Sequence, residues 1–348
     1  MKQQVFSWVV VGAGPAGIAA IGKLLDRNIP KEEICWIDPV FKVGDLGEKW
    51  LYVSSNTKVD LFLRFLNDCS AFRYKECKQR FPIDELAPSD HCLLKEIAAP
   101  LQWVTDHLRE TVSSVEGEAV GLVRQNGSWE IETRSSSIRA KNVVLCIGSE
   151  PKQLSYPRPQ AIPLETALDP SKLAKEVDSE DVVGVFGASH SSVLIMASLL
   201  ELHPKMVHNF YRSPHTYAIE FEDWILFDNI GLKGFAAKWA KEHLDGTLPK
   251  NLNRCLVSDK LFDELLAECT KVIYSVGFRR RKTPVIEQYP KAEYQETTGI
   301  IAPGLFGLGI AYPQAQFDRL GNLEYRVGLW KFMDYLNSVL PFWLEYGN

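Results

Sequence analysis

Three glycines near the N-terminus have the spacing of a turn that binds a pyrophosphate. Gly12, Gly14 and Gly17 form a Gly-x-Gly-x-x-Gly pattern directly after an apolar run. In a dinucleotide-binding fold the first glycine permits the tight turn, the second lets the backbone approach the pyrophosphate, and the third lets helix and strand pack closely. The helix that follows, starting at Pro15 and Ala16, offers free N–H groups and the positive end of its dipole to the phosphates.

An acidic residue stands where such a turn would place the ribose of an adenosine. Residues 34–37 are predicted to form a second buried strand, which ends at Asp38, 21 residues after Gly17. A carboxylate at this position accepts hydrogen bonds from the ribose hydroxyls. Strand, turn, helix, strand and acid therefore occur in the order of a dinucleotide-binding unit, and this context argues against a chance glycine turn.

A second turn of this kind occurs in the middle of the chain, with serines in place of two glycines. Gly187, Ser189 and Ser192 occupy the three positions after an apolar strand. Serine is small enough for the helix to pack near the strand, and its hydroxyl can donate to a phosphate oxygen. The next predicted strand ends at Arg212, and a guanidinium there accommodates a 2′-phosphate where a carboxylate would favour a 2′-hydroxyl. The pattern favours a dinucleotide that carries a 2′-phosphate.

The serines of the second turn do not fit a hydrolase nucleophile elbow. That motif requires Gly-x-Ser-x-Gly, because its strained turn tolerates little bulk, and the last position is Ser191 here. His190 adjoins Ser189 in sequence, but a catalytic triad requires spatial adjacency and an orienting acid. Two interpretations of His190 stay open: a neighbour of the phosphates or nicotinamide, and a packed or solvated histidine.

Hydrophobic periodicity predicts that strands and helices alternate along most of the chain. A polar, glycine-rich loop at 44–57 interrupts the pattern, and Asn126-Gly127 predicts a hairpin between two further strands. The predicted strands are 8–11, 34–37, 142–148, 182–186 and 206–211, and the predicted helices are 16–27, 58–73, 90–110 and one from 193 onwards.

Composition limits the classes of function. The length of 348 residues allows about two domains. A net charge of -5 gives no indication of nucleic acid or an anionic membrane as the main partner, and the basic run 279–282 is interpreted as a solvated loop. Seven scattered cysteines without a Cys-x-x-Cys pair fit a reducing compartment, and the predicted location is cytoplasmic.

No segment of the sequence reaches the ~20 apolar residues that a membrane span requires. The C-terminal stretch 330–343 is aromatic and amphipathic, so it could contact a membrane surface or a partner helix. Burial against its own domain is favoured, because the stretch carries no basic face.

In their order along the chain, these motifs resemble those of the pyridine nucleotide-dependent flavin oxidoreductases, and within them the flavin-containing monooxygenases and related N-hydroxylases. The resemblance covers most of the chain. It implies an α/β fold of two Rossmann-like three-layer dinucleotide-binding domains, the second inserted into the first. Residues 1–152 and 276–348 would form the FAD-binding domain, and residues 153–275 would form the NAD(P)H-binding domain, with NADPH as the nicotinamide cofactor.

The resemblance also implies roles for further residues near the cofactors and in the linker between the domains. Residues 272–278 are similar to the second linker strand, and residues 304–313 to the segment that passes the flavin ribityl and ring. Residues 47–57 resemble the monooxygenase loop near the isoalloxazine, which makes Asn56 the candidate flavin-proximal amide. The remaining cofactor-binding positions implied are Trp50, Gly148, Gly277 and Gly309.

For function, the resemblance implies a monooxygenase that acts on a small nitrogen or sulfur nucleophile with O2, through a flavin C4a-hydroperoxide. Two departures from the pattern of the family keep other classes of function open. The segment Gly309-Ile310-Ala311 lacks the acid that relatives often carry, and no Cys-x-x-Cys is present for disulfide reduction. The alternatives are an NADPH-dependent flavin reductase or electron-transfer protein, and a flavin-binding regulatory protein without turnover. A homo-oligomer is compatible with all three.

Overall fold

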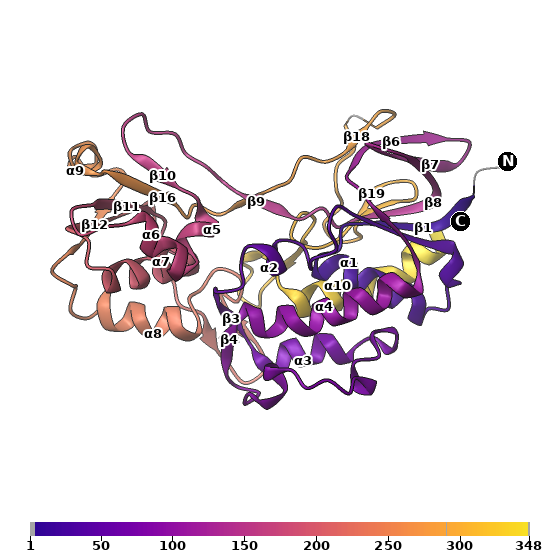
Figure 1. The fold of residues 1–348 in the computed structure, drawn as a ribbon, viewed down its shortest axis with the longest axis horizontal. Coiled ribbons are helices and arrows are strands. Elements are labelled where there is room, and N and C mark those ends of the chain that lie inside the picture. Colours follow the sequence, from indigo (N-terminus) through magenta and orange to yellow (C-terminus); the bar gives the residue numbers. More distant parts are fainter. Residues whose placement is uncertain (1–3, 290, 347–348) are drawn as a thin grey trace.

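The computed structural model describes residues 4–289 and 291–346 and has two lobes, each built around its own sheet (Figure 1). Two short strands, β9 (Ser149–Pro151) and β17 (Phe278–Arg280), pair antiparallel and connect the lobes. The chain enters the second lobe through β9 and returns through β17. The second unit is therefore inserted into the first, which confirms the predicted fold class.

The first lobe contains a nine-stranded sheet with a parallel centre. Strand β1 (Val5–Val11) lies between β2 (Ile34–Asp38) and β8 (Ser137–Leu145), and β8 also pairs in parallel with β20 (Leu305–Gly307). The other strands of this sheet are β5 (Ser113–Glu116), β6 (Ala119–Gln125), β7 (Ser128–Thr133), β18 (Val285–Ile286) and β19 (Ile300–Ala302).

Alternate residues of β1 and β2 belong to two different cores, which makes the first lobe three-layered. Trp8 and Val10 pack with the helices, whereas Val9 and Val11 pack with the β6–β7–β8 meander. The helices on the first face are α1 (Pro15–Asp26), α3 (Val59–Asn67), α4 (Leu94–Thr111) and α10 (Leu329–Tyr346).

The C-terminal aromatic stretch lies in α10 and is buried against its own lobe. The Trp343 side chain is fully buried and stacks on Phe306, with ring centroids 4.7 Å apart. This confirms the burial that was favoured from the sequence. Within the described ranges, no helix is both long and apolar enough to cross a bilayer.

The second lobe contains a five-stranded, fully parallel sheet in the order β10–β16–β11–β12–β15. Helices α5 to α8 pack on one face and α9 on the other. Their bounds are β10 (Gln160–Ile162), α5 (Leu164–Ala167), α6 (Pro170–Glu176), β11 (Val182–Phe186), α7 (His190–Glu201), β12 (Met206–Tyr211), α8 (Gly234–His243), β15 (Leu252–Leu256), α9 (Phe262–Glu268) and β16 (Lys271–Tyr274).

Short elements complete the chain. Three two-stranded ribbons are formed by β3 (Ser54–Lys58) with β4 (His91–Leu93), β13 (Ile219–Glu220) with β14 (Ile225–Leu226), and β21 (Gln314–Phe317) with β22 (Leu323–Arg326). The short helix is α2 (Asp45–Glu48), and 3-10 turns span Lys31–Glu33, Ser70–Phe72, Tyr74–Glu76 and Pro82–Glu85.

The structure differs from the sequence-based secondary structure in several places, of which three concern the type of element. The helix predicted from residue 90 begins at Leu94, because residues 91–93 pair with β3 as strand β4. The predicted loop 44–57 contains α2 and most of β3. Residues 271–274 belong to the second sheet as β16, so the returning linker strand is β17 and not 272–278.

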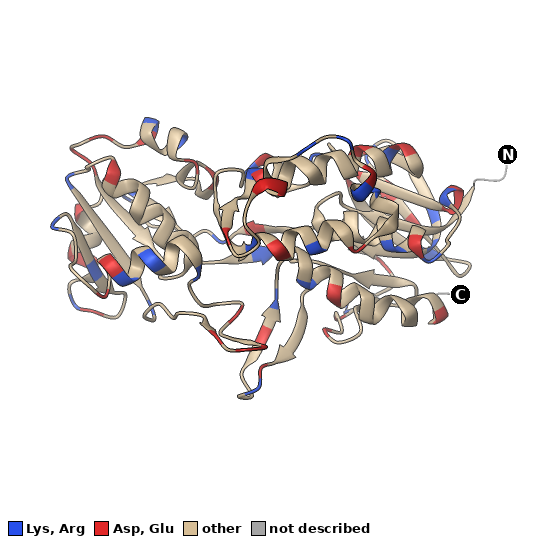
Figure 2. Cartoon of the chain, turned by 90° about the horizontal axis from the view of Figure 1, so that it is seen from below, with Lys and Arg blue, Asp and Glu red and all other residues tan. Residues whose placement is uncertain are grey.

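Charged residues of both signs are interspersed over both lobes, as Figure 2 shows. This distribution agrees with the small net charge of -5.

Candidate functional site

The first glycine turn lies at the carboxyl end of β1, and its three glycines meet different surroundings. Gly12 has φ +107°, and a Cβ there would come within 2.3 Å of the Cys146 carbonyl oxygen. A Cβ on Gly17 would lie 1.8 Å from the Gly12 oxygen, whereas one on Gly14 would meet nothing closer than the Val43 oxygen at 3.9 Å. The fold therefore requires glycine at 12 and 17, while Gly14 leaves space that a ligand could fill.

The start of helix α1 is suited to an anion. Its N-cap residue is Gly14, which offers no side chain to the first N–H groups, and Pro15 is the first helical residue. Unsatisfied N–H groups and the helix dipole at such a terminus attract phosphate. The space above Gly14 and this helix end together fit a pyrophosphate.

Asp38 is buried at the end of β2 and holds the turn in place. One carboxylate oxygen accepts from the Ala13 N–H at 2.7 Å, and the other accepts from the N–H groups of Val40 and Phe41 at 2.9 and 2.7 Å. A carboxylate has about four acceptor sites, so one remains for a ribose hydroxyl. Asp38 can thus position the turn and contact the ribose at the same time.

Gly309 comes from the far end of the chain to the same place. It has φ +89°, and a Cβ there would lie 2.6 Å from the Cβ of Ala16 in the first turn of α1. The neighbouring Leu308 N–H donates to the Leu145 oxygen at 3.0 Å, which fixes the segment at the end of β8. The structure therefore brings Gly309 next to the glycine turn.

The second turn repeats the geometry of the first. Gly187 has φ +123°, and a Cβ there would come within 2.4 Å of the Ser275 carbonyl oxygen. The Gly187 N–H donates to the Phe210 oxygen at 2.8 Å, just as Gly12 donates to the end of β2 at 2.7 Å. Both lobes therefore place a tight turn over the carboxyl ends of two parallel strands.

The two serines of the second turn differ in exposure. Ser192 is fully buried, and its hydroxyl donates to the Ser189 carbonyl oxygen at 2.8 Å. Ser189 is exposed as the N-cap of α7, and its side chain makes no capping hydrogen bond. The Ser192 hydroxyl is used inside the turn, and the hydroxyl that lies at the surface is that of Ser189.

Arg212 is exposed directly after β12, and a second arginine lies on the neighbouring strand. The Arg254 guanidinium lies 4.6 Å from the centroid of the Tyr211 ring, and its Nε donates to Asn209 Oδ1 at 3.2 Å. Asn209 is fully buried and donates to the Gly187 oxygen at 2.7 Å. Asn209 and Arg254 were not found from the sequence, because their placement depends on the register between β12 and β15.

Gly148 and Gly277 lie just before the two linker strands. Both have positive φ, +72° and +89°, and a Cβ on either would meet no atom within 4 Å. The Gly277 oxygen accepts from the Lys152 N–H at 2.9 Å, and the Gly148 oxygen accepts from the Arg281 N–H at 3.3 Å. They are turns at the crossing between the lobes, remote in sequence and paired in space.

Trp50 and Asn56 lie where the first lobe meets the second. The Trp50 ring contacts Phe278 of β17 edge-on, with ring centroids 5.9 Å apart. Trp50 and Val53 also pack against the core that helices α5 to α8 form on the second sheet. Asn56 is half-buried on β3, and its Oδ1 accepts from the Thr57 hydroxyl at 3.3 Å. The amide nitrogen of Asn56 therefore stays available to a ligand.

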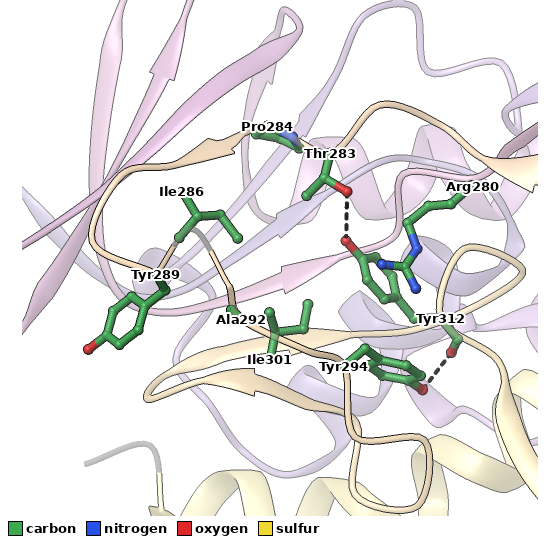
Figure 3. A pocket seen from close by; sticks show the side chains of 9 residues that line it. All are labelled: Arg280, Thr283, Pro284, Ile286, Tyr289, Ala292, Tyr294, Ile301 and Tyr312. Atoms are coloured by element: carbon green, nitrogen blue, oxygen red, sulfur yellow. Dashed lines mark hydrogen bonds between the residues drawn. The ribbon is translucent and has the colours of Figure 1, made fainter.

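The basic run 279–282 is more than a solvated loop, which corrects the sequence-based interpretation. Arg279 pairs with Glu150 at 2.7 Å and Arg281 pairs with Asp45. The Arg280 guanidinium lies over the Tyr312 ring, 4.2 Å from its centroid (Figure 3). Its Nε donates to the Ala311 oxygen at 2.7 Å. This run therefore ties the returning linker to the segment that carries Gly309.

A cavity of about 190 Å³ lies beside this arginine, and Figure 3 shows the side chains that line it. The Tyr294 hydroxyl donates to the Tyr312 oxygen at 2.7 Å, and Thr283 lies 3.5 Å from the Tyr312 hydroxyl. A second cavity of about 270 Å³ lies between the β3–β4 ribbon and the body of α7. Its lining includes Tyr52, Ser54, Leu93, Leu194, Glu201 and Phe235.

The cysteines offer no redox-active pair. All seven are free, and six are buried. Burial raises the pKa of Cys92 to about 11 and that of Cys35 to about 12, so these thiols stay protonated at neutral pH. The described residues contain no cluster of three or more His, Cys, Asp or Glu side chains that could hold a metal ion.

Two histidines at the junction of the lobes have pKa values lowered mainly by burial. His190 lies in α7 and His91 in β4; the other charged groups that act on them are Lys58, Asp90, Glu220 and Lys233. In the unfolded chain both titrate at about 6.5. Because the unfolded state then binds more protons, we expect the free energy of unfolding to fall as pH decreases below about 6.5.

Urea unfolding at pH 7.5, 6.5 and 5.5 measures this dependence. His91→Asn is expected to reduce the loss of stability between pH 7.5 and 5.5, whereas the exposed His203→Asn is expected to keep it. An equal loss in His91→Asn and the unmutated protein would show that His91 contributes nothing to it.

The chain matches no family model, but it matches a curated relative over nearly its whole length. It is 33% identical to monooxygenase AgnR1 from Paecilomyces divaricatus over 384 aligned positions, which cover 97% of each protein.

Solved structures with the same fold are far more distant in sequence. The ornithine N-hydroxylase KtzI from Kutzneria sp. 744, with reduced FAD, NADP+ and L-ornithine, is 12% identical with a TM-score of 0.69, covering 99% of this chain and 100% of that one. A flavin-containing monooxygenase from Stenotrophomonas maltophilia is 12% identical with a TM-score of 0.67 and the same coverage. The thioredoxin reductase of Lactococcus lactis is 11% identical with a TM-score of 0.58, covering 98% of this chain and 99% of that one.

At such low identity the solved structures show the fold alone, whereas the similarity to AgnR1 extends over nearly the whole sequence. Both agree with the family that the motifs resembled. The chain therefore belongs to the flavoprotein oxidoreductases with two dinucleotide-binding domains, among the relatives of the monooxygenase AgnR1.

Proposed function

We propose that this protein is an NADPH-dependent FAD monooxygenase that oxygenates a small nitrogen or sulfur nucleophile. The observation that carries the proposal is the pair of equivalent turns at Gly12 and Gly187, one on each lobe, in a relative of a monooxygenase. Residues 1–152 and 276–348 would bind FAD, and residues 153–275 would bind NADPH. Bound FAD would supply the redox chemistry, namely the acceptance of hydride from NADPH and the activation of O2.

The residues of the first lobe fit FAD by their surroundings. The backbone at Gly14 leaves room for the pyrophosphate, and Asp38 keeps an acceptor site for the adenosine ribose. Gly309 lies against the first turn of α1, and its backbone would lie beside the ribityl chain of the flavin. We propose that Trp50 and Asn56, at the junction of the lobes, line the flavin ring.

The residues of the second lobe fit NADPH in a similar way. The pyrophosphate would lie at the start of α7, where the Ser189 hydroxyl makes no capping hydrogen bond. The exposed guanidinium of Arg212, at the end of β12, would bind the 2′-phosphate. Gly187 and Ser192 shape the turn itself. Gly148 and Gly277 shape the crossing between the lobes, and we propose that they border the cofactor sites there.

An anaerobic mixture of purified protein with NADPH, followed by admission of air, tests the function. We expect the flavin absorbance to bleach with NADPH and to return in air, with an oxygenated product when an amine or sulfide substrate is present. Electrons that pass rapidly to quinones or a carrier protein, with no oxygenated product from any amine or sulfide, would identify a reductase.

Asn56→Ala is expected to leave flavin reduction by NADPH nearly unchanged and to raise hydrogen peroxide release per NADPH consumed several-fold. The amide is half-buried at the junction, and its loss would admit water to a site that must exclude it. Peroxide and product are measured together at saturating substrate.

Thr57→Val is the matched control, because it removes the hydroxyl that contacts Asn56 but keeps the amide. It should keep the coupling of the unmutated protein. Equal peroxide release from Asn56→Ala and the unmutated protein would remove Asn56 from the site.

A further inference from the structure

The second dinucleotide turn is joined to the first lobe by one histidine. His190 is the first residue of α7 and directly follows Ser189. Its Nε2 lies 2.7 Å from the backbone oxygen of Ser54, the first residue of β3. The contact spans the two lobes, between the turn proposed for NADPH and the strand that carries Asn56.

The chemistry of the pair defines the state of the ring. A carbonyl oxygen can only accept, so Nε2 carries the proton and donates to Ser54. Burial lowers the pKa of His190, so the ring is neutral at pH 7 and its Nδ1 is a bare acceptor. Nδ1 is buried and has no hydrogen-bond partner. The ring is therefore held by a single directional bond.

The other contacts around this junction are apolar, steric or largely exposed. Lys58 of β3 pairs with Glu220 at 2.8 Å, but both side chains are partly or largely in solvent, where an ion pair constrains geometry little. Trp50 and Val53 pack against the core of the second lobe, and the His91 ring lies beside Gly234 at the start of α8. Apolar contacts are non-directional and tolerate small displacements. The hydrogen bond from His190 to Ser54 is directional, so it can fix the position of the turn along β3.

We propose that His190 is a positioning residue for the transfer of a hydride between the two bound cofactors. Its bond to Ser54 fixes the second turn against β3, and so fixes the distance from the nicotinamide to the flavin ring. The hydride carries two electrons from NADPH, which becomes NADP+, to FAD, which becomes reduced. This inference rests on the proposed function.

The size of the effect follows from the demands of hydride transfer. A misplacement of about 1 Å, even one caused far from the reacting atoms, can slow a reaction by roughly a hundredfold. Loss of the His190 bond is therefore expected to slow flavin reduction by about ten- to a hundredfold. NADPH affinity should change little, because His190 holds the turn and not the dinucleotide.

Three substitutions separate this role from simple packing. His190→Gln keeps an N–H donor at about the same reach as Nε2, His190→Asn keeps the same amide one methylene shorter, and His190→Leu keeps only bulk. The matched control is His203→Asn, an exposed histidine just beyond the other end of α7. Stopped-flow reduction of each holoprotein gives the rate constant at saturating NADPH and the apparent Kd separately.

We expect the rate constant to fall about ten- to a hundredfold in His190→Leu and His190→Asn, and to return to within about threefold of the unmutated value in His190→Gln, with Kd unchanged throughout. Equal rates in His190→Leu and the unmutated protein overturn the proposal. Equal losses in the Gln and Leu variants, or a loss confined to Kd, overturn it as well.

A second readout needs no turnover. Hydrogen exchange of the amides in 54–58 and 187–193 should be faster in His190→Leu than in His190→Gln, because the junction opens more often without the bond. Equal exchange in the two variants would contradict the role. If the unmutated protein is not reduced by NADPH at all, the proposed function fails and this proposal fails with it. Normal reduction with an insensitive His190 overturns the proposal alone.

Discussion

Replacing Gly14 is expected to leave the fold intact and to remove FAD from the protein. A Cβ at this position would meet no protein atom closer than 3.9 Å, so the chain itself tolerates a side chain. A bound pyrophosphate does not, because the backbone must approach it closely. Gly14→Ala should weaken FAD binding about ten- to a hundredfold, from the 1–3 kcal/mol that overpacking costs, and Gly14→Val should abolish it. FAD content per protein, read after denaturation, measures the loss.

Gly17→Ala is the contrasting control. Its Cβ would lie 1.8 Å from the Gly12 oxygen, so α1 cannot pack on β1 without moving. We expect this variant to unfold or to lose much of its stability, whereas Gly14→Ala should keep the melting temperature of the protein without cofactor. A Gly14→Val protein that still binds FAD stoichiometrically would contradict the assignment of the first turn.

Arg212→Ala is expected to erase roughly ten- to a hundredfold of the preference for NADPH over NADH. A charge-assisted hydrogen bond is worth about 1.5–3 kcal/mol, and each 1.4 kcal/mol corresponds to tenfold in binding. Arg212 makes the stronger candidate because it is exposed at the end of β12, whereas Arg254 is already engaged with Asn209 and Tyr211. The ratio of kcat/KM values for the two nucleotides measures the preference.

The control for this change is Arg158→Ala, which removes an exposed arginine from the connection before β10. It should leave the ratio unchanged. Equal use of NADPH and NADH by the unmutated protein would refute the role of Arg212. A change of selectivity in Arg254→Ala without one in Arg212→Ala would move the 2′-phosphate contact to the neighbouring strand.

The parts of the fold that were predictable are those set by local sequence. The strand at 182–186 is predicted with its observed ends, and Asn126-Gly127 forms the predicted hairpin with φ values of +50° and +79°. The apolar stripe of 58–73 is buried as expected, although α3 ends at Asn67 and a 3-10 turn continues it.

The missed elements depend on pairing between distant segments. Strand β4 replaces the first turn of a predicted helix because Lys58 pairs with His91. Strand β17 forms because Arg279 pairs with Glu150 across the linker. Neither partner can be recognised from the periodicity of its own segment, since the hydrogen bonds come from elsewhere in the chain.

The same limit applies to the site. Gly12, Gly14 and Gly17 were predictable because a tight turn restricts the residue type at each position. The roles of Asn209 and His190 were not, because Asn209 acts through the register of β11 with β12, and His190 acts through a backbone oxygen of the other lobe. A backbone acceptor has no sequence signature.

The insertion of one lobe into the other also sets an order of events on the ribosome. All five strands of the second sheet come from one continuous stretch, 160–274. The first lobe needs β20 and α10, which are made after the whole second lobe, and α10 packs on α1, which is made before it. The second lobe can therefore complete its core during synthesis, while the part of α1 that α10 covers stays open until α10 has been made. A released chain truncated between β16 and β20 should show a protease-resistant second lobe beside an unfinished first one.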